Sequence, residues 1–168
     1  MALSMHQAGV PTITRALNNL IGVLEKAAAH CEAKKVDPAV MIGSRLYPDM
    51  FPLAKQVQVA TDIAKGGASR LAGVEIPKWE DNETTFADLI ERLRKTIAYL
   101  ETLKTEPIDA AETRTIKWTQ QGKDMEQVGK DYLFTRVIPN VFFHCSTAYN
   151  ILRHNGVEIG KGDFLGKM

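Results

Sequence analysis

The chain has 168 residues, a length that suits one domain able to bury a hydrophobic core without disulfides or a structural metal. We therefore expect a single domain over residues 1–168. Hydrophobic residues make up 45% and charged residues 24%, which are globular values and argue against a disordered or fibrous chain. The formal charge of +1 creates no field that would attract nucleic acid or an anionic membrane, so neither is an expected partner.

We expect neither a secretion signal nor a membrane-spanning segment. Residues 1–19 lack the basic start and continuous apolar run of a signal peptide, and no later run of about 18 apolar residues could span a bilayer. Cys31 and Cys145 match no metal-binding or redox spacing, so we interpret both as small buried or half-buried residues. We expect a cytoplasmic protein in which both thiols stay reduced.

Two long helices are predicted in the first half of the chain by apolar residues that recur at intervals of three and four. The first spans about residues 4–35, and Pro11 is expected to kink its beginning or to separate a short segment from it. A short helix follows, with Asp37 as its cap and Pro38 at its first position. The second long helix begins near Asp49. The inward-facing residues are Ile13, Leu17, Leu20, Ile21, Leu24 and Ala28 in the first helix, and Met50, Leu53, Val57, Ala60, Ala64 and Leu71 in the second.

A third long helix is predicted to begin at Asp81 or Asn82, after a loop. In the helix before it, Gly66 and Gly67 each weaken the helix by about 1 kcal/mol relative to alanine, unless close packing against a neighbour needs the missing side chains. The inward-facing residues of the third helix are Phe86, Leu89, Ile90, Leu93, Ile97 and Leu100.

A small β-hairpin is predicted within residues 106–128, because RTIKWTQ alternates apolar and polar residues, QG favours a turn and KDMEQV can return as a second strand. The last long helix covers residues 130–154 and ends at Gly156. Pro139 is expected to bend this helix or to free a backbone carbonyl one turn earlier. Four amphipathic helices indicate an all-α four-helix bundle with the hairpin before the last helix.

Two histidines lie on the last helix, His144 and His154. Ten residues separate their backbones by about 15 Å and leave them on different faces, so they cannot share a metal ion. We interpret His154 as a helix-end residue. His144 lies in line with Val141 and Ala148 and faces the interior, where it is either a core histidine with one hydrogen bond or a ligand-binding or acid–base group.

Polar residues of the second helix are the candidate partners of His144. Asp49, Gln56 and Asp62 lie along or beside its apolar stripe, and Gln56 is the hardest of them to explain as solvated. Tyr149 flanks His144 on the last helix. Each of these residues has an alternative role, which is solvation or capping for the helix-two residues and packing for the tyrosine. Trp118 is interpreted as hairpin packing.

Three segments of the chain, residues 45–77, 81–100 and 142–166, resemble a bacterial and fungal family of uncharacterised proteins. That family is grouped with the DinB/YfiT-like metalloenzymes, and the resemblance covers nearly the whole chain. It implies a four-helix bundle of up-down-down-up type with a long connection before the last helix. It also implies association as a homodimer.

Members of the wider superfamily hold a divalent metal with three histidines, one on the second helix and two, four residues apart, on the fourth. Some of them act on adducts of low-molecular-weight thiols. His144 matches the first histidine of the helix-four pair, but Ala148 stands where the second is expected and residues 49–62 contain no histidine. We therefore expect no tightly held transition metal, and a weak divalent-metal site that uses His144 with Asp49 or Gln56 stays open.

Two functions are compatible with these observations. The first is a small-molecule pocket between the second and last long helices, in which His144 acts as an acid–base or anchoring group and Asp49, Gln56, Asp62 and Tyr149 surround the ligand. The second is a non-catalytic dimeric bundle, a structural or stress-related protein, in which the same residues form a polar network. Whether the protein is an enzyme rests on superfamily analogy alone. Residues 156–168 are expected to cover the end of the bundle or to join the dimer contact.

Overall fold

The computed structural model describes residues 3–166, which are mostly helical with a small two-stranded antiparallel sheet. Within this range no helix is both long and apolar enough to cross a membrane. The elements are α1 Met5–Lys34, α2 Pro38–Gly43, α3 Leu53–Ala72, α4 Phe86–Glu101, α5 Thr105–Asp109, β1 Thr115–Gln120, β2 Lys123–Val128, α6 Gly129–Asp131, the π-helix η1 Tyr132–Val137, α7 Ile138–His154 and α8 Lys161–Leu165.

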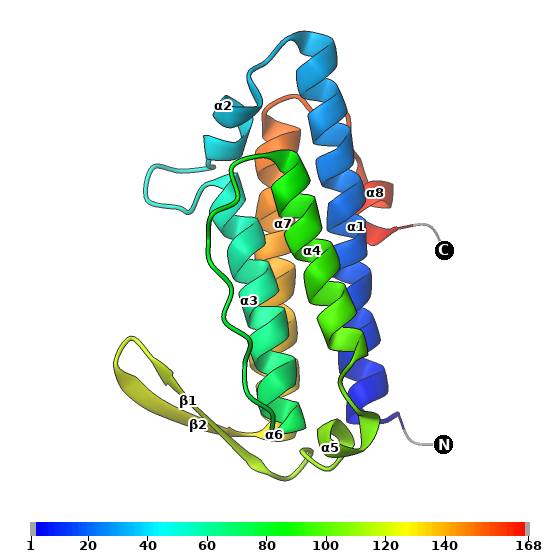
Figure 1. Cartoon of the computed structure of the whole chain (residues 1–168), viewed down its shortest axis with the longest axis vertical. Coiled ribbons are helices and arrows are strands. Elements are labelled where there is room, and N and C mark those ends of the chain that lie inside the picture. The colour runs from blue at the N-terminus through cyan, green and yellow to red at the C-terminus, as the bar shows by residue number, and fades with distance from the viewer. Residues whose placement is uncertain (1–2, 167–168) are drawn as a thin grey trace.

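The long helices α1, α3, α4 and α7 lie side by side (Figure 1). Helix α3 packs against α7 and α4, and α1 packs against α4 and α7. The connection of residues 73–85 runs back alongside α3, so that α4 begins near the end of the molecule at which α3 begins (Figure 1). The hairpin lies at the opposite end, close to where α3 finishes. It projects from the bundle and packs on α3 through β1.

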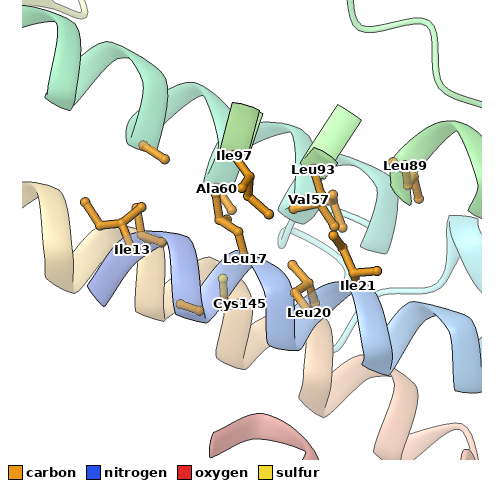
Figure 2. Close-up of a cluster of buried hydrophobic side chains, with 14 of the residues drawn as sticks. Ile13, Leu17, Leu20, Ile21, Val57, Ala60, Leu89, Leu93, Ile97 and Cys145 are labelled. Carbon is orange, nitrogen blue, oxygen red and sulfur yellow. The ribbon is translucent and has the colours of Figure 1, made fainter. Parts of the chain in front are cut away.

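The core fills the space between these helices. Figure 2 shows apolar side chains of α1, α3 and α4 meeting in one cluster, with the thiol of Cys145 from α7 beside them. The predicted inward faces are confirmed, because almost every residue assigned to them is buried. The exceptions are Ala28, which is half-buried at the edge of the core, and Met50, which precedes α3.

Two predicted helix starts are wrong. Helix α3 begins at Leu53 rather than near Asp49, because Pro52 stands at its N-cap and disfavours helical backbone in the residue before it. Helix α4 begins after Thr85 rather than at Asp81 or Asn82. Thr85 accepts a hydrogen bond from the backbone of Asp88 at 3.1 Å and donates its own backbone N–H to that carboxylate at 2.9 Å, which is a capping box.

Helix α1 is continuous from Met5 to Lys34 with Pro11 inside it, so no separate short segment precedes it. Asp37 and Pro38 begin the short helix α2 as predicted. The predicted hairpin is confirmed, with Gln121 at φ 50° and Gly122 at φ 74°. Positive φ at both positions defines the two-residue turn whose twist suits a hairpin.

The last long helix is not regular throughout. The predicted segment 130–154 contains a π-helix, Tyr132–Val137, directly before α7. Pro139 has no N–H for the usual bond to the carbonyl four residues earlier, which accounts for the irregular turns that precede it. The next carbonyl, that of Arg136, accepts a hydrogen bond from the Asn140 side chain at 2.8 Å.

The last helix of the tail, α8, lies along the bundle rather than over its end. Helix α8 sits beside α1 (Figure 1). Arg15 and Asn19 of α1 donate to the backbone carbonyls of Leu165 and Phe164. The expectation that the tail covers the end of the bundle is therefore wrong for residues 161–165, and residues 167–168 lie outside the described range.

Candidate functional site

The imidazole of His144 is hydrogen-bonded to Gln56 across the interface between α7 and α3. Its Nδ1 atom lies 2.7 Å from Gln56 Oε1. The Gln56 amide is itself oriented, because its Nε2 donates to the backbone carbonyl of Phe51 at 3.0 Å. The amide oxygen therefore faces the imidazole, so Nδ1 carries the proton and donates it. The other ring nitrogen, Nε2, is an acceptor in the neutral ring.

Burial keeps this imidazole neutral. The residue is 8% exposed, and desolvation lowers the pKa of His144 below its ordinary value. It is therefore uncharged at pH 7. Within residues 3–166, Nε2 of this histidine forms no hydrogen bond. A neutral Nε2 atom can accept a hydrogen bond or a proton from a bound molecule.

His144 lies on the wall of a surface cavity of about 370 Å³. The cavity is enclosed by α3, by η1 with the beginning of α7, and by β1 of the hairpin. The polar and aromatic residues used below are Asp62 and Arg70 of α3, Tyr132 and Arg136 of η1, Trp118 of β1 and His144 of α7.

The five predicted site residues occupy different places. Gln56 is bonded to His144, and Asp62 lines the cavity. Asp49 is exposed in the loop before α3 and does not line the cavity. Tyr149 is on another face of α7, where its ring packs against the ring of Phe164 in α8, with the two ring centroids 5.8 Å apart. His144 and Asp62 therefore line one cavity, and Gln56 is joined to it through its bond to His144.

The sequence prediction omitted the two arginines and Tyr132 and assigned Trp118 to packing. Trp118 and Tyr132 pack together with ring centroids 4.9 Å apart. Arg70 Nη1 donates to the Tyr132 hydroxyl at 3.3 Å, and the Arg136 guanidinium lies 4.6 Å from the centre of the Trp118 ring. The only available signal was the four-residue spacing of Tyr132 and Arg136, which places both on one helical face.

Asp62 is held by cations outside the cavity. Its Oδ1 atom lies 3.0 Å from Arg92 Nη2 and 3.1 Å from Lys65 Nζ. Arg92 also pairs with Asp81 and Glu83 of the connection between α3 and α4. The negative charge of Asp62 is therefore compensated before any ligand enters the cavity.

These residues do not fit the metal centre that the family resemblance implies. No group of three or more His, Cys, Asp or Glu side chains within residues 3–166 is close enough to hold a metal ion. Ala148 is fully buried at the position of the second helix-four ligand. Nδ1 of His144 is bonded to Gln56, so these two groups are not free to bind a cation together.

We predict that chelation of divalent metals leaves the protein intact. Treatment with EDTA, or addition of Ni²⁺ or Zn²⁺ in slight excess, should leave the melting temperature within about 1 °C, because residues 3–166 contain no cluster of His, Cys, Asp or Glu that would bind metal preferentially in the folded state. Differential scanning calorimetry with elemental analysis measures this. A clear rise in melting temperature with Ni²⁺ that is lost in His144→Asn would contradict the prediction.

The two cysteines do not add a nucleophile. Both are buried, and burial raises the pKa of the Cys145 thiol to about 12. Burial, followed by the charge of Asp37, also raises the pKa of Cys31. Neither thiol is a thiolate at neutral pH, which agrees with their interpretation as buried residues.

Comparison with known proteins identifies the class of this bundle. The chain is similar to a DinB family member protein from Shewanella denitrificans, whose crystal structure superimposes with a TM-score of 0.88. The two sequences are 43% identical over 97% of this chain and 92% of that one. No curated protein matches the chain.

The family itself follows from the sequence. Residues 5–165 match the model of a family described as a domain of unknown function, DUF1993. The chain belongs to this family, and its fold is DinB-like. The predicted membership of an uncharacterised DinB-like family is confirmed.

Proposed function

We propose that this protein binds a small molecule in the cavity between α3, η1, α7 and the hairpin, with His144 as its acid–base or anchoring group. The observation that carries the proposal is the neutral imidazole of His144, which lines the cavity, has its tautomer fixed by Gln56 and leaves Nε2 without a hydrogen bond within residues 3–166. We also propose that the long helices follow the up-down-down-up order of DinB/YfiT-like bundles, which the return path of residues 73–85 supports (Figure 1).

The chemistry of His144 suits both an acid–base group and an anchoring group. Gln56 holds the Nδ1 proton, so the ring cannot rotate freely and Nε2 keeps one direction. A general base near neutral pH has to be unprotonated before it acts, and burial ensures this. The cavity, at about 370 Å³, is of the size that holds a small metabolite. The proposal needs no metal ion.

His144→Asn tests the proposal. Asparagine places an amide nitrogen near the position of Nδ1 and retains the bond to Gln56, but it lacks the acceptor at Nε2. We expect at least a tenfold loss of affinity for any ligand found in a metabolite screen by native mass spectrometry, because one hydrogen bond to the ligand is lost. The melting temperature should fall by less than about 3 °C, because the bond between helices is kept.

His154→Asn is the matched control, since His154 is an exposed histidine at the end of the same helix. It should change neither affinity nor stability. Unchanged ligand affinity in His144→Asn would contradict the proposal.

A second candidate function is a non-catalytic structural bundle. One observation favours it, because the His144–Gln56 bond joins α7 to α3 and His144 is almost fully buried. In that case His144→Ala and Gln56→Ala should each destabilise the protein strongly, and the metabolite screen should return no ligand that contacts the cavity.

A further inference from the structure

We propose that the ligand of this cavity is a small organic acid, and that Arg70 and Arg136 together bind its carboxylate or phosphate group. This inference rests on the proposed function and specifies the chemical class of the ligand. Both arginines line the cavity, Arg70 from α3 and Arg136 from η1. Both are half-buried, where the charge of an anion is screened less than on an open surface.

Neither arginine pairs with a carboxylate of the described residues. Among residues 3–166, no carboxylate lies within ion-pair distance of Arg70 or Arg136. Asp62 is the one carboxylate that lines the same cavity in this part of the chain, and Arg92 and Lys65 bind it. The cavity therefore contains two positive charges with no compensating negative charge. A bound anion would supply that charge.

Neutral groups already orient both guanidiniums. Arg70 donates to the hydroxyl of Tyr132, and Arg136 donates to the Gln120 side chain at 2.5 Å and stacks on Trp118. Each guanidinium donates one such bond within the described residues, so most of its N–H groups remain available. An arginine that is held in place loses little conformational entropy when it binds a ligand oxygen.

A third donor in the same wall lacks a partner. Nε1 of Trp118 is buried and finds no acceptor within residues 3–166. A buried N–H group without an acceptor is rare in folded proteins and calls for an explanation. Trp118 packs against Tyr132, whose hydroxyl accepts a hydrogen bond from Arg70. The Arg136 guanidinium lies over the Trp118 ring. Trp118 lines the cavity, so the NMR signal of its indole N–H reports on a molecule bound against this side chain.

The cavity wall also indicates the rest of the ligand. Half-buried Trp118 lines the cavity beside the arginines with Tyr132, 3% exposed, packed against it, whereas His144 and Asn140 line the cavity as neutral polar groups. A molecule with an acidic group and a flat apolar body would place its acid at the arginines and its body against Trp118. Simple aromatic acids are therefore suitable probes.

Benzoate and phenyl phosphate, each compared with neutral benzamide, test the inference by NMR. The chain has two tryptophans, so Trp79→Phe assigns the indole N–H signal of Trp118. We expect both acids, or the one with the preferred acidic group, to shift that signal in a saturable way. Benzamide should not shift it at ten times the concentration. Affinity should decrease as salt is added, because the interaction is ionic.

The double variant Arg70→Gln, Arg136→Gln should weaken binding of the acid at least tenfold. Its control is Arg94→Gln, Arg153→Gln, which removes the same charge from exposed positions and should leave affinity unchanged. Arg136→Lys supplies a second comparison if the double variant does not fold. Lysine keeps the charge but loses the planar stacked group, and should give an intermediate affinity.

The outcomes separate this inference from the proposed function. Equal affinity for benzamide and benzoate, or unchanged affinity in the arginine double variant, would overturn the organic-acid inference and leave a small-molecule site. If no probe binds but the metabolite screen yields neutral ligands that require His144, only the organic-acid inference fails. If no ligand of any charge binds in the cavity, both proposals fail.

Discussion

Replacement of Arg92 by methionine is expected to lower the free energy of unfolding by roughly 2–4 kcal/mol, because Glu83 loses its ion-pair partner and Asp62 and Asp81 keep only Lys65 and Lys55. The Arg92 side chain is 2% exposed and forms ion pairs with Asp62, Asp81 and Glu83. Methionine fills similar space but neutralises none of these charges. Glu83, with a side chain only 10% exposed, is affected most.

The loss should also loosen the connection between α3 and α4. Arg92 donates to the backbone carbonyl of Glu80 at 2.9 Å and to Thr61 Oγ1 at 2.7 Å, so it joins the connection to both helices. The melting temperature should fall by roughly 5–15 °C. Urea unfolding followed by circular dichroism measures the change. The control is Arg94→Met, since Arg94 is more than half exposed and its one ion pair within residues 3–166 is with Glu25 at 3.4 Å, a contact of little stabilising value.

The difference in the free energy of unfolding between the wild type and Arg92→Met should become smaller at acidic pH. Burial alone would raise the pKa of Asp81, but the hydrogen bond from Lys55 and the charge of Arg92 lower it below its ordinary value. A carboxylate with a lowered folded-state pKa contributes stability above about pH 4, and this contribution is lost as the pH falls through the folded-state pKa. The variant has less of this contribution to lose. A constant difference between pH 7 and pH 3 would contradict the ionic explanation.

Gly67→Ala is expected to destabilise the protein by roughly 1–3 kcal/mol, even though alanine favours helices. A Cβ atom at Gly67 would lie 2.6 Å from Val137 Cγ1 and 2.8 Å from Cγ2. Both methyl groups are too close, so a change of the valine rotamer does not relieve the contact. The backbones of α3 and η1 have to separate.

The neighbouring glycine is a matched control for this prediction. A Cβ at Gly66 would meet only the flexible end of Arg70, at 3.1 Å, and the edge of Ile76 at 3.9 Å. Gly66→Ala should therefore be neutral or stabilise the protein by up to about 1 kcal/mol. Adding Val137→Ala to Gly67→Ala should restore part of the loss. Equal stability of Gly66→Ala and Gly67→Ala in thermal unfolding would show that the contact does not matter.

Helical spacing predicted the bundle well because burial follows the three-and-four period of the long helices. The same spacing placed His144 inward, and the hairpin followed from the preference of Gln-Gly for a turn with positive φ. The error at Asp49 was local, since Pro52 delayed the start of α3. The predicted homodimer and cytoplasmic location stay predictions.

The remainder of the site depends on contacts that no periodicity encodes. Arg92 stands on α4 two residues after the inward-facing Ile90. From the sequence, a charged side chain at this position is expected to face solvent. It is buried because the connection of residues 73–85 crosses that face. Arg70 and Arg136 are far apart in sequence and share a cavity only because α3 packs closely on η1.

The β-hairpin affects how quickly a ligand could leave. Within the described residues its two strands form a sheet with each other alone. The hairpin is held on the bundle by buried Ile116, by Trp118 against Tyr132, and by two side-chain hydrogen bonds to η1, Arg136 to Gln120 and Gln127 to Thr135. A two-stranded sheet has little stability of its own, so it opens with a smaller free energy than the bundle unfolds. Trp118 and Gln120 form one wall of the cavity. Local opening of the hairpin would therefore expose the cavity to solvent while every long helix stays in place. The lifetime of a complex would then be set by hairpin opening rather than by global stability.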